Sequence, residues 1–451
     1  MPNLTQLRLA AREIFDETMH AVDAGAAVRR AVRLNGTQLS VCDATLDIAN
    51  RKIYSIGIGK AAFPMAYALE QVLGDSFTAG FLSGPVSWRA VPGPAHEMKI
   101  KTRWRWCEGG HPIPNRTSFL SATEAFALLQ RANDERALVI FLVSGGGSAM
   151  LEWPVNEKIT LTDMRTASKA LINCGASISE VNAVRRTFSA VKGGRLGAHA
   201  PDCDQLTLIV ADVPNGEEQN VASGPTLMPP SDAPKAMDVI NRYDLRSKFP
   251  ETVLRAIEND EGSSEIDSAS LRKHFVLLDN ESALKAAAEA ARCRGFTTEI
   301  AEDISDQPIE EGCKLLVTRL KTLCDRARTK PGEARSVCLI SGGEFACPVK
   351  SEGLGGRNSE TALRLAIEPG LSRSESFVAL CAGTDGIDGN SPAAGAIVDD
   401  TTCARAQAIG LEPSAFIDRS DAYSFFVALG DAFAPGATGT NVRDIRILLA
   451  D

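Results

Sequence analysis

The chain has 451 residues, of which 44% are hydrophobic and 23% are charged, and its formal net charge is −9. The length argues against a single domain, since ordinary domains contain roughly 100–200 residues, and the composition is that of a globular protein. The negative charge argues against a nucleic-acid partner or an anionic membrane surface. A small anionic ligand would therefore need a local basic pocket.

The eleven cysteines are scattered and include no Cys-x-x-Cys pair, so neither a disulfide framework nor a zinc site is expected. The opening stretch MPNLTQLRLAAREIFDETMH carries Glu13, Asp16 and Glu17 and lacks the apolar core of a signal peptide. The longest apolar run, 137–143, is too short to span a membrane. We therefore expect a cytoplasmic protein with reduced thiols.

Short apolar runs alternate with amphipathic stretches, which indicates an α/β protein with largely parallel sheets. The clearest predicted strands are 52–59, 137–145, 206–213, 275–279, 337–342 and 377–383. Polar sequence at 258–273 is the best linker candidate. It predicts a larger N-terminal domain, 1–265, and a smaller C-terminal domain, 270–451, whose last residues could pack back on the N-terminal one. Ligands of such sheets bind where the strands end.

The stretch SIGIGKAA, residues 55–62, is the first candidate ligand loop. Its glycines resemble a dinucleotide fingerprint, but that motif needs an acidic residue about 20 positions further on. The corresponding stretch TAGFLSGP, 78–85, has none. What remains is a turn that brings Lys60 to a helix N-terminus, where a cation is disfavoured unless an anion binds. Lys60 is therefore interpreted as a substrate- or phosphate-binding lysine, with an exposed surface lysine as the alternative.

A second glycine turn, LVSGGGSAM at 142–150, could cradle a phosphate with its N–H groups or could simply allow tight packing. It lacks the Gly-Lys-Ser/Thr ending of a P-loop and the Gly-x-Ser-x-Gly of a hydrolase. The residues concerned are Ser144, Gly145, Gly146, Gly147 and Ser148.

Basic residues cluster in VNAVRRTFSAVKGGRLG, 181–197, where Arg185, Arg186, Lys192 and Arg195 stand beside a glycine pair. In an acidic chain such a cluster suits a polyanion. A solvated helix face is an equally good interpretation.

Acidic residues follow several predicted strands. Asp212, in VADVPNGEEQNVASGPT, ends an apolar run, and a carboxylate there can hold Mg²⁺. SGGE supplies Glu344, and GLGGRNSE supplies Arg357 and Asn358 at the start of a predicted helix, where the arginine can clamp a carboxylate or phosphate. The chain has no His-Glu-x-x-His and no Cys/His cluster, which disfavours a zinc enzyme. Together these features indicate phosphoryl chemistry with magnesium.

Two more carboxylates, Asp385 and Asp388, stand in CAGTDGIDGNSPAAGA directly after an apolar run. The stretch lacks the ligand spacing of a calcium loop. Asp385 is closer to the strand end and is predicted to be the functional one. Asp388 is predicted to fix the turn through its own backbone hydrogen bonds.

In order and spacing, several stretches resemble the class II glycerate 2-kinases, whose C-terminal part is called the MOFRL domain. These stretches are GIGKAA, GGHPIPN, LVSGGGSA, VNAVRRTFSAVKGGRLG, ASGPT, LGGRNSE, AGTDGIDG and TGTNV. The resemblance implies a larger Rossmann-like domain and a smaller MOFRL-type domain, with the active site in the cleft between them. It also implies ATP-dependent phosphorylation of D-glycerate at its 2-hydroxyl, with Mg²⁺.

The resemblance places the family's lysine on Lys60, its Leu-Gly-Gly-Arg-Asn arginine on Arg357 and its Gly-Thr-Asp-Gly-x-Asp-Gly carboxylates on Asp385 and Asp388. Lys60, Arg357 and Asp385 are the expected catalytic residues. The Ser-Gly-Gly-Gly-Ser turn, with Arg185 and Lys192, is expected to hold the ATP phosphates. Asp212 or Asp385 is expected to carry Mg²⁺. Which of Lys60 and Arg357 binds carboxylate and which binds phosphate stays open. Further expected binding residues are Glu344, Asn358 and Asp388.

The chain departs from the family's usual pattern in three places: Glu217 and Glu218 replace aspartates, Thr187 replaces a histidine, and the segment 87–108 is atypical. Two other functions remain open. One is an NAD(P)-dependent reductase of hydroxypyruvate or tartronate semialdehyde, and the other is a sugar-phosphate isomerase-like binding module. The expected partners are the small molecules D-glycerate and ATP, and a homodimer is allowed.

Overall fold

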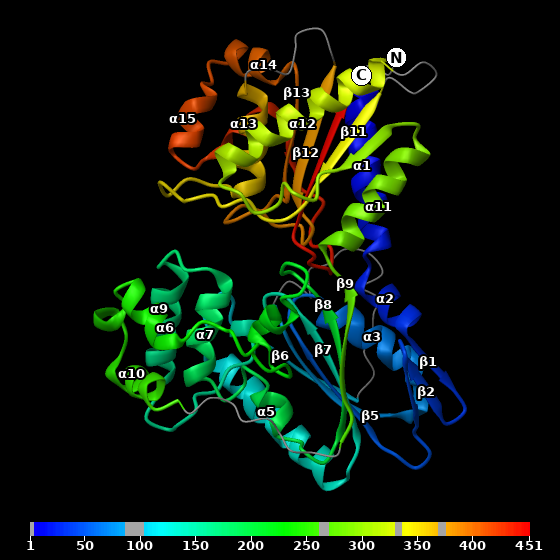
Figure 1. The fold of residues 1–451 in the computed structure, drawn as a ribbon, viewed down its shortest axis with the longest axis vertical. Coiled ribbons are helices and arrows are strands. Elements are labelled where there is room, and N and C mark those ends of the chain that lie inside the picture. The colour runs from blue at the N-terminus through cyan, green and yellow to red at the C-terminus, as the bar shows by residue number, and fades with distance from the viewer. Residues whose placement is uncertain (1–3, 86–102, 261–269, 330–335, 369–375) are drawn as a thin grey trace. The chain divides into compact units, whose positions relative to one another are not determined.

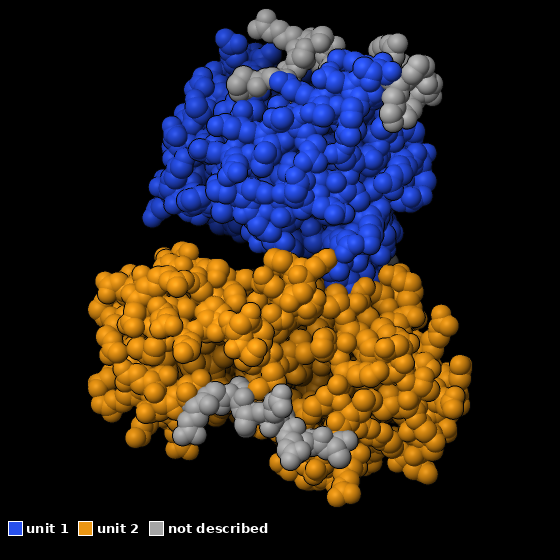
Figure 2. Space-filling model, viewed as in Figure 1, with its two compact units in different colours: residues 1–23, 278–451 blue, residues 24–277 orange. Residues whose placement is uncertain are grey.

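The computed structural model contains two compact units (Figures 1 and 2). Unit 1 consists of residues 1–23 and 278–451, and unit 2 consists of residues 24–277. Unit 2 is therefore inserted into the sequence of unit 1. The structure describes residues 4–85, 103–260, 270–329, 336–368 and 376–451.

The division expected from the sequence, 1–265 and 270–451, stays a prediction, as does the cleft between two domains. The contacts of the first helix, α1 (Leu4–Ala21), nevertheless group it with the C-terminal half of the chain. The linker predicted at 258–273 lies largely outside the described residues, and so does most of the atypical segment 87–108.

Unit 2 is built around a six-stranded sheet in its described residues, with the order β6-β5-β4-β7-β8-β9. The pairs β5–β6, β4–β5, β4–β7 and β7–β8 are all parallel. Numbered in chain order, the first five of these strands follow the order 3-2-1-4-5, so the order reverses between β4 and β7, and open α/β sheets bind ligands at such a switch point. The strands are β4 (Ile53–Ile58), β5 (Phe77–Gly84), β6 (Trp104–Glu108), β7 (Leu138–Ser144), β8 (Asp204–Val210) and β9 (Arg272–Leu278).

Helices cover this sheet because its central strands are apolar on both faces: every residue of β4 and β7 is buried. Helix α5 packs on the face that carries Tyr54, Ile56 and Phe141, and α3 contacts β4, β5 and β7. Helices α6, α7, α9 and α10 enclose a separate apolar cluster that includes Leu171 and Phe188. The helices of unit 2 are α2 (Ala24–Ala31), α3 (Ala62–Leu73), α5 (Arg116–Asp134), α6 (Leu161–Ile172), α7 (Ile178–Phe188), α8 (Arg195–Ala198), α9 (Ala236–Arg242) and α10 (Glu251–Glu258).

A small antiparallel sheet, with the order β1-β2-β3, also belongs to unit 2. Its strands are β1 (Val32–Asn35), β2 (Gln38–Val41) and β3 (Ala44–Asp47).

Unit 1 contains a six-stranded mixed sheet in its described part, with the order β10-β11-β15-β12-β13-β14. Strands β10, β11, β12 and β14 run in one direction, and β13 and β15 run against them. The last strand of the chain, β15, therefore lies in the middle of this sheet, between β11 and β12 (Figure 1). The strands are β10 (Thr297–Ile300), β11 (Val337–Ser341), β12 (Phe377–Gly383), β13 (Gly395–Asp399), β14 (Ala432–Phe433) and β15 (Asp444–Ala450).

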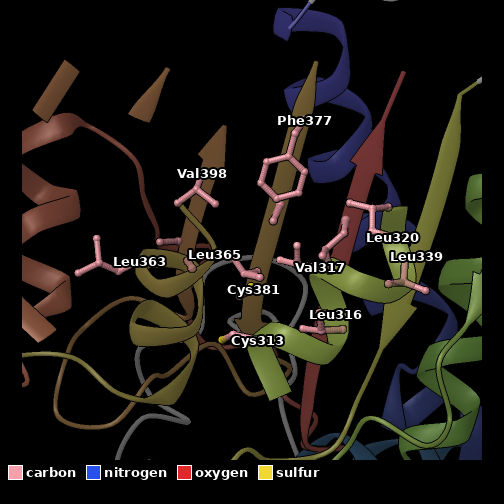
Figure 3. Close-up of a cluster of buried hydrophobic side chains, with 14 of the residues drawn as sticks. Cys313, Leu316, Val317, Leu320, Leu339, Leu363, Leu365, Phe377, Cys381 and Val398 are labelled. Atoms are coloured by element: carbon pink, nitrogen blue, oxygen red, sulfur yellow. The ribbon is translucent and has the colours of Figure 1, made fainter. Parts of the chain in front are cut away.

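The two faces of this sheet carry two separate cores, because successive side chains of a strand point to opposite faces. Leu339 and Phe377 join the core beneath α12, α13 and α16, which Figure 3 shows. Their neighbours Ile340 and Val378 join the core beneath α1 and α11. The helices are α11 (Asn280–Cys293), α12 (Ile309–Thr329), α13 (Arg357–Ile367), α14 (Thr402–Ala408), α15 (Pro413–Asp418) and α16 (Ala422–Leu429).

Helix α1 is fixed to unit 1 by apolar and ionic contacts. Phe15 is fully buried and meets the ring of Phe433 edge-on, with 4.9 Å between ring centroids. Arg8 pairs with the buried carboxylates of Asp399 and Asp431. The first helix is thus part of the α1–α11 layer of unit 1.

The α/β fold class is confirmed, and all six strands expected from the sequence are present as β4, β7, β8, β9, β11 and β12. The last strand, β15, pairs inside unit 1. In the described part of the chain, no helix is both long enough and apolar enough to cross a membrane.

We predict that Phe15→Ala lowers the free energy of unfolding of unit 1 by about 3–5 kcal/mol, because it opens a cavity between α1 and the sheet. Leu9→Ala on the exposed side of α1 is the matched control and should change it by no more than about 0.5 kcal/mol. Urea unfolding followed by far-UV circular dichroism measures both. Equal midpoints for the two variants would contradict the docking of α1.

Candidate active site

The turns after β4 and β7 are bonded to each other at the switch point of unit 2. The N–H of Lys60 donates to the carbonyl of Gly145 at 3.0 Å, and the N–H of Ala61 donates to Oγ of Ser144 at 2.9 Å. Gly59 has φ of +108°, and a Cβ there would lie 2.3 Å from the Ser144 carbonyl oxygen. Only glycine permits so close an approach of the two turns.

The side chain of Lys60 lies against the glycine turn of β7. A Cβ at Gly146 would be 3.2 Å from both Cγ and Cε of Lys60, and Gly146 has φ of +79°. The long stem of the lysine therefore occupies space that a larger residue at 146 would take. The two glycine motifs, separated by over eighty residues in sequence, form one surface at the carboxyl ends of β4 and β7.

The far end of the β7 turn is held by buried polar groups. Oγ of Ser148 shares a 2.8 Å hydrogen bond with Oγ of Ser223, which donates in turn to Asn182. Nζ of Lys192 donates to the carbonyl of Ser148 at 2.7 Å and pairs with Glu152. Lys192 is 1% exposed. Burial lowers the pKa of Lys192, and the adjacent Glu152 carboxylate opposes that shift.

Three residues of the predicted basic cluster do not form a solvated helix face, because their side chains bond to groups of the protein itself. Arg186 is buried, donates to Gln219 and Asn220, and has its pKa lowered to about 10 by burial. Arg195 donates to the carbonyl of Ser189 and pairs with Asp260, which lies two residues after α10. With Lys192, these residues stabilise the packing beneath the turn.

Arg185 differs from its neighbours. Its side chain is only partly exposed, and the structure shows no hydrogen bond from its guanidinium to any residue in the described ranges. Burial lowers the pKa of Arg185, and the nearby Glu152 carboxylate only partly offsets this. A desolvated guanidinium without an acceptor gains most from a bound anion.

Asp212 lies two residues after β8, the neighbour of β7, and is partly exposed. It is thus at the same edge of the sheet as Lys60 and the β7 turn. Among the residues that the structure describes, no group of three or more His, Cys, Asp or Glu side chains could hold a metal ion.

The predicted residues of unit 1 gather around the start of α13. Nε and Nη2 of Arg357 donate to the two oxygens of Asp444, and Nη2 also pairs with Glu344 at 2.8 Å. Burial alone lowers the pKa of Arg357, but the two carboxylates outweigh it and hold the pKa above its usual value. Nδ2 of Asn358 donates to Asp444 at 2.9 Å.

Asp388 caps α13. Its two carboxylate oxygens accept the backbone N–H groups of Asn358 and Ser359 at 2.9 and 2.8 Å, and it also accepts the Ser359 hydroxyl. A carboxylate is favourable at a helix N-terminus. Burial raises the pKa of Asp388, against the effect of these hydrogen bonds. The backbone of Asp388 fixes its own turn as expected, since its carbonyl accepts the N–H and the hydroxyl of Ser391, and its side chain in addition fixes the helix of another segment.

Asp385 is partly exposed, and its Oδ1 accepts the N–H of Ile387 at 3.0 Å, which also fixes the turn. A Cβ at Gly383 would lie 3.1 Å from Oδ1 of Asp385 and 3.6 Å from Nδ2 of Asn358. Asp385 and Asn358 therefore both approach Gly383, and Asn358 also bonds to the Asp444 carboxylate that holds Arg357.

Asp444 is the residue that sequence reasoning missed. In the sequence Asp444 is the last residue of ATGTNVRD. A single acidic residue at the start of an apolar strand does not by itself indicate a ligand site. The pairing of Gly383 with Asp444 across β12 and β15 brings it to the other predicted residues.

Comparisons with known proteins match this arrangement. Residues 10–258 match the family model "Domain of unknown function (DUF4147)", and residues 337–444 match the MOFRL family. A D-glycerate 2-kinase of Thermotoga maritima is 32% identical over 400 residues, covering 88% of this chain and 90% of the relative. A putative hydroxypyruvate reductase of Agrobacterium vitis is 36% identical over 401 residues, covering 87% and 98%.

Solved structures agree. A crystal structure of glycerate kinase from Thermotoga maritima superposes with a TM-score of 0.78, at 28% identity and 99% coverage of both chains. A crystal structure of a Pyrococcus horikoshii protein gives 0.74, at 30% identity and 98% coverage of both. The protein is thus an enzyme of the kinase class. It belongs to the DUF4147–MOFRL family, the class II glycerate 2-kinases.

We predict that Lys192→Met lowers the free energy of unfolding by about 3–5 kcal/mol, because it leaves Glu152 buried without its cation. Lys169→Met, on the exposed side of α6, is the matched control and should have little effect. Thermal unfolding measures both. Equal melting temperatures would instead favour a Lys192 that is free to bind a ligand.

Proposed function

We propose that the protein is an ATP-dependent D-glycerate 2-kinase. It transfers the terminal phosphoryl group of ATP to the 2-hydroxyl of D-glycerate and releases 2-phosphoglycerate and ADP. The observation that carries the proposal is the Lys60 side chain lying against the glycine turn of β7 at the switch point of the sheet. Membership of a glycerate kinase family supports it.

Phosphoryl transfer depends on positioning and charge neutralisation more than on covalent chemistry of the protein. In unit 2, Lys60, the backbone of Gly145 to Ser148 and the Arg185 guanidinium are the proposed phosphate-binding groups. Ser144 and Lys192 are assigned a supporting role, because their polar atoms already bond to the turns. Ser144 and Lys192, which the sequence suggested as binding residues, are thus proposed to hold the turns in place.

In unit 1, Arg357 is the proposed anion-binding residue. Its Nε and Nη2 are engaged by carboxylates, whereas Nη1 has no hydrogen bond to a residue in the described part of the chain. Nη1 is proposed to bind an oxygen of the glycerate carboxylate or of the transferred phosphoryl group. Asp385 is proposed to accept the proton of the 2-hydroxyl.

The residues present fit an anionic nucleotide, because Arg185 is a desolvated cation without an acceptor in the described ranges. They also fit Mg²⁺, which usually takes one or two carboxylates and keeps several waters. Asp212 or Asp385 is the proposed carboxylate. When bound, ATP supplies the phosphoryl group, and Mg²⁺ offsets part of its charge.

A reductase is the second candidate, because some relatives carry the name putative hydroxypyruvate reductase. The dinucleotide motif needs an acid at the end of the strand after the first glycine turn. That strand is β5, and it ends with Leu82, Ser83 and Gly84. The kinase proposal is therefore favoured.

We predict that the protein forms 2-phosphoglycerate, and not 3-phosphoglycerate, from D-glycerate and ATP, and that it does not oxidise NADH with hydroxypyruvate. Enzymes specific for each phosphoglycerate, coupled to the reaction, measure the product.

Lys60→Ala should lower kcat/KM by about 10²–10³. Lys52→Ala, at the other end of β4 and exposed, is the control and should retain full activity. Turnover of NADH, or full activity of Lys60→Ala, would reject the assignment.

We predict that Arg185→Met weakens ATP binding at least about tenfold while the melting temperature stays equal or rises, because burying an unpaired charge costs stability. Arg165→Met, exposed on α6, should change neither quantity. Isothermal titration with a non-hydrolysable ATP analogue measures the affinity. A fall in stability with unchanged affinity would show that Arg185 only supports the fold.

A further inference from the structure

We propose that Asp444 is a positioning residue, which orients the Arg357 guanidinium so that Nη1 faces the ligand. This inference deepens the proposed function, since it assigns the residue on which the anion-binding arginine depends. Three features carry it: the paired hydrogen bonds between the two side chains, the burial of Asp444, and the place of Asp444 at the start of the central strand of unit 1.

The hydrogen bonds define one edge of the guanidinium. Nε and Nη2 of Arg357 donate to separate oxygens of Asp444. A guanidinium is planar, so a two-point contact along one edge fixes the direction of the whole group. The opposite N–H groups, on Nη1, then have a set direction.

Glu344 makes a different contact with the guanidinium. It pairs with Nη2 at 2.8 Å, whereas Asp444 accepts from both Nε and Nη2. Its side chain is 34% exposed, whereas that of Asp444 is 2% exposed. An ion pair that water reaches less is stronger and better ordered.

The backbone holds Asp444 rigidly. It is the first residue of β15 and pairs with Gly383 of β12, and its carbonyl accepts the side-chain amide of Asn280 at 3.0 Å. Nδ2 of Asn358 donates to the same carboxylate. The carboxylate is therefore fixed by strand, side chain and burial, while Arg357 begins a helix that Asp388 caps. Such support is what a site needs to hold a catalytic group to within a fraction of an ångström.

A double-mutant cycle of Asp444→Asn and Arg357→Ala tests whether Asp444 acts through Arg357. The isosteric Asp444→Asn should lower kcat at least about tenfold, and Asp444→Glu should recover part of the loss. The double variant should be no slower than Arg357→Ala alone, because both changes remove the same function. Multiplied effects would overturn the proposal.

Chemical rescue gives a second readout that a merely structural role would not move. Millimolar guanidinium should restore part of the activity of Arg357→Ala, because Asp444 can bind the free cation where the side chain was. The same addition should fail in the double variant. Equal rescue of both variants would overturn the proposal.

Asp399→Asn is the matched control, since Asp399 is a buried carboxylate of unit 1 that pairs with Arg8 and lies in no proposed ligand site. It should lower the melting temperature and leave kcat unchanged. A crystal structure of Asp444→Ala tests the inference without any assay. Arg357 displaced or without density supports it, and Arg357 in its original place overturns it. If the wild-type protein fails to phosphorylate glycerate, the proposed function falls while this structural test still decides the inference.

Discussion

The hydrogen bonds between the turns after β4 and β7 are the interaction on which the unit 2 site depends. Parallel strands bring their carboxyl ends to one edge, and at the switch point the following helices leave the two strands without filling the space between them. The bond from Ala61 to Ser144 joins the turns there. The Ser144 hydroxyl is engaged in this bond and so holds the two turns together. The turns proposed to bind phosphate are therefore held at the carboxyl ends of two neighbouring parallel strands.

Unit 1 organises charge differently. Its candidate residues come from four segments, and carboxylates outnumber arginines among them: Glu344 and Asp444 pair with Arg357, and Asp385 and Asp388 lie on the loop after β12. Asp388 caps a helix, and Glu344 and Asp444 both pair with Arg357, so three of the four carboxylates are engaged by other groups of unit 1. The balance also explains why an arginine, with five donors and a permanent charge, stands at this position and not a lysine. A lysine could not serve two acceptors along one edge and keep a further donor in a set direction.

Much of this could be predicted from the sequence, because glycine turns after apolar runs are local signals. The six strands and the placing of both glycine turns at strand ends followed from such patterns, while the kinase family followed from the resemblance of several motifs in order and spacing. The contacts of Arg186, Lys192 and Arg195 within the protein could not be predicted. A basic residue looks the same in a sequence whether its side chain faces water or bonds to buried groups. Asp444 and the helix cap by Asp388 could not be predicted either, because both depend on long-range strand pairing.

The place of β15 has a consequence for how the chain is made. Unit 2 is complete once residue 277 has been synthesised, so its sheet can form while the rest is still emerging. Unit 1 begins with the first helix, yet its sheet lacks a central strand until residues 444–450 leave the ribosome. Until then β11 and β12 have unpaired edges facing the gap, and such edges invite pairing with other chains. Residues 444–450 therefore complete the sheet of unit 1 as well as supplying Asp444 to the candidate site.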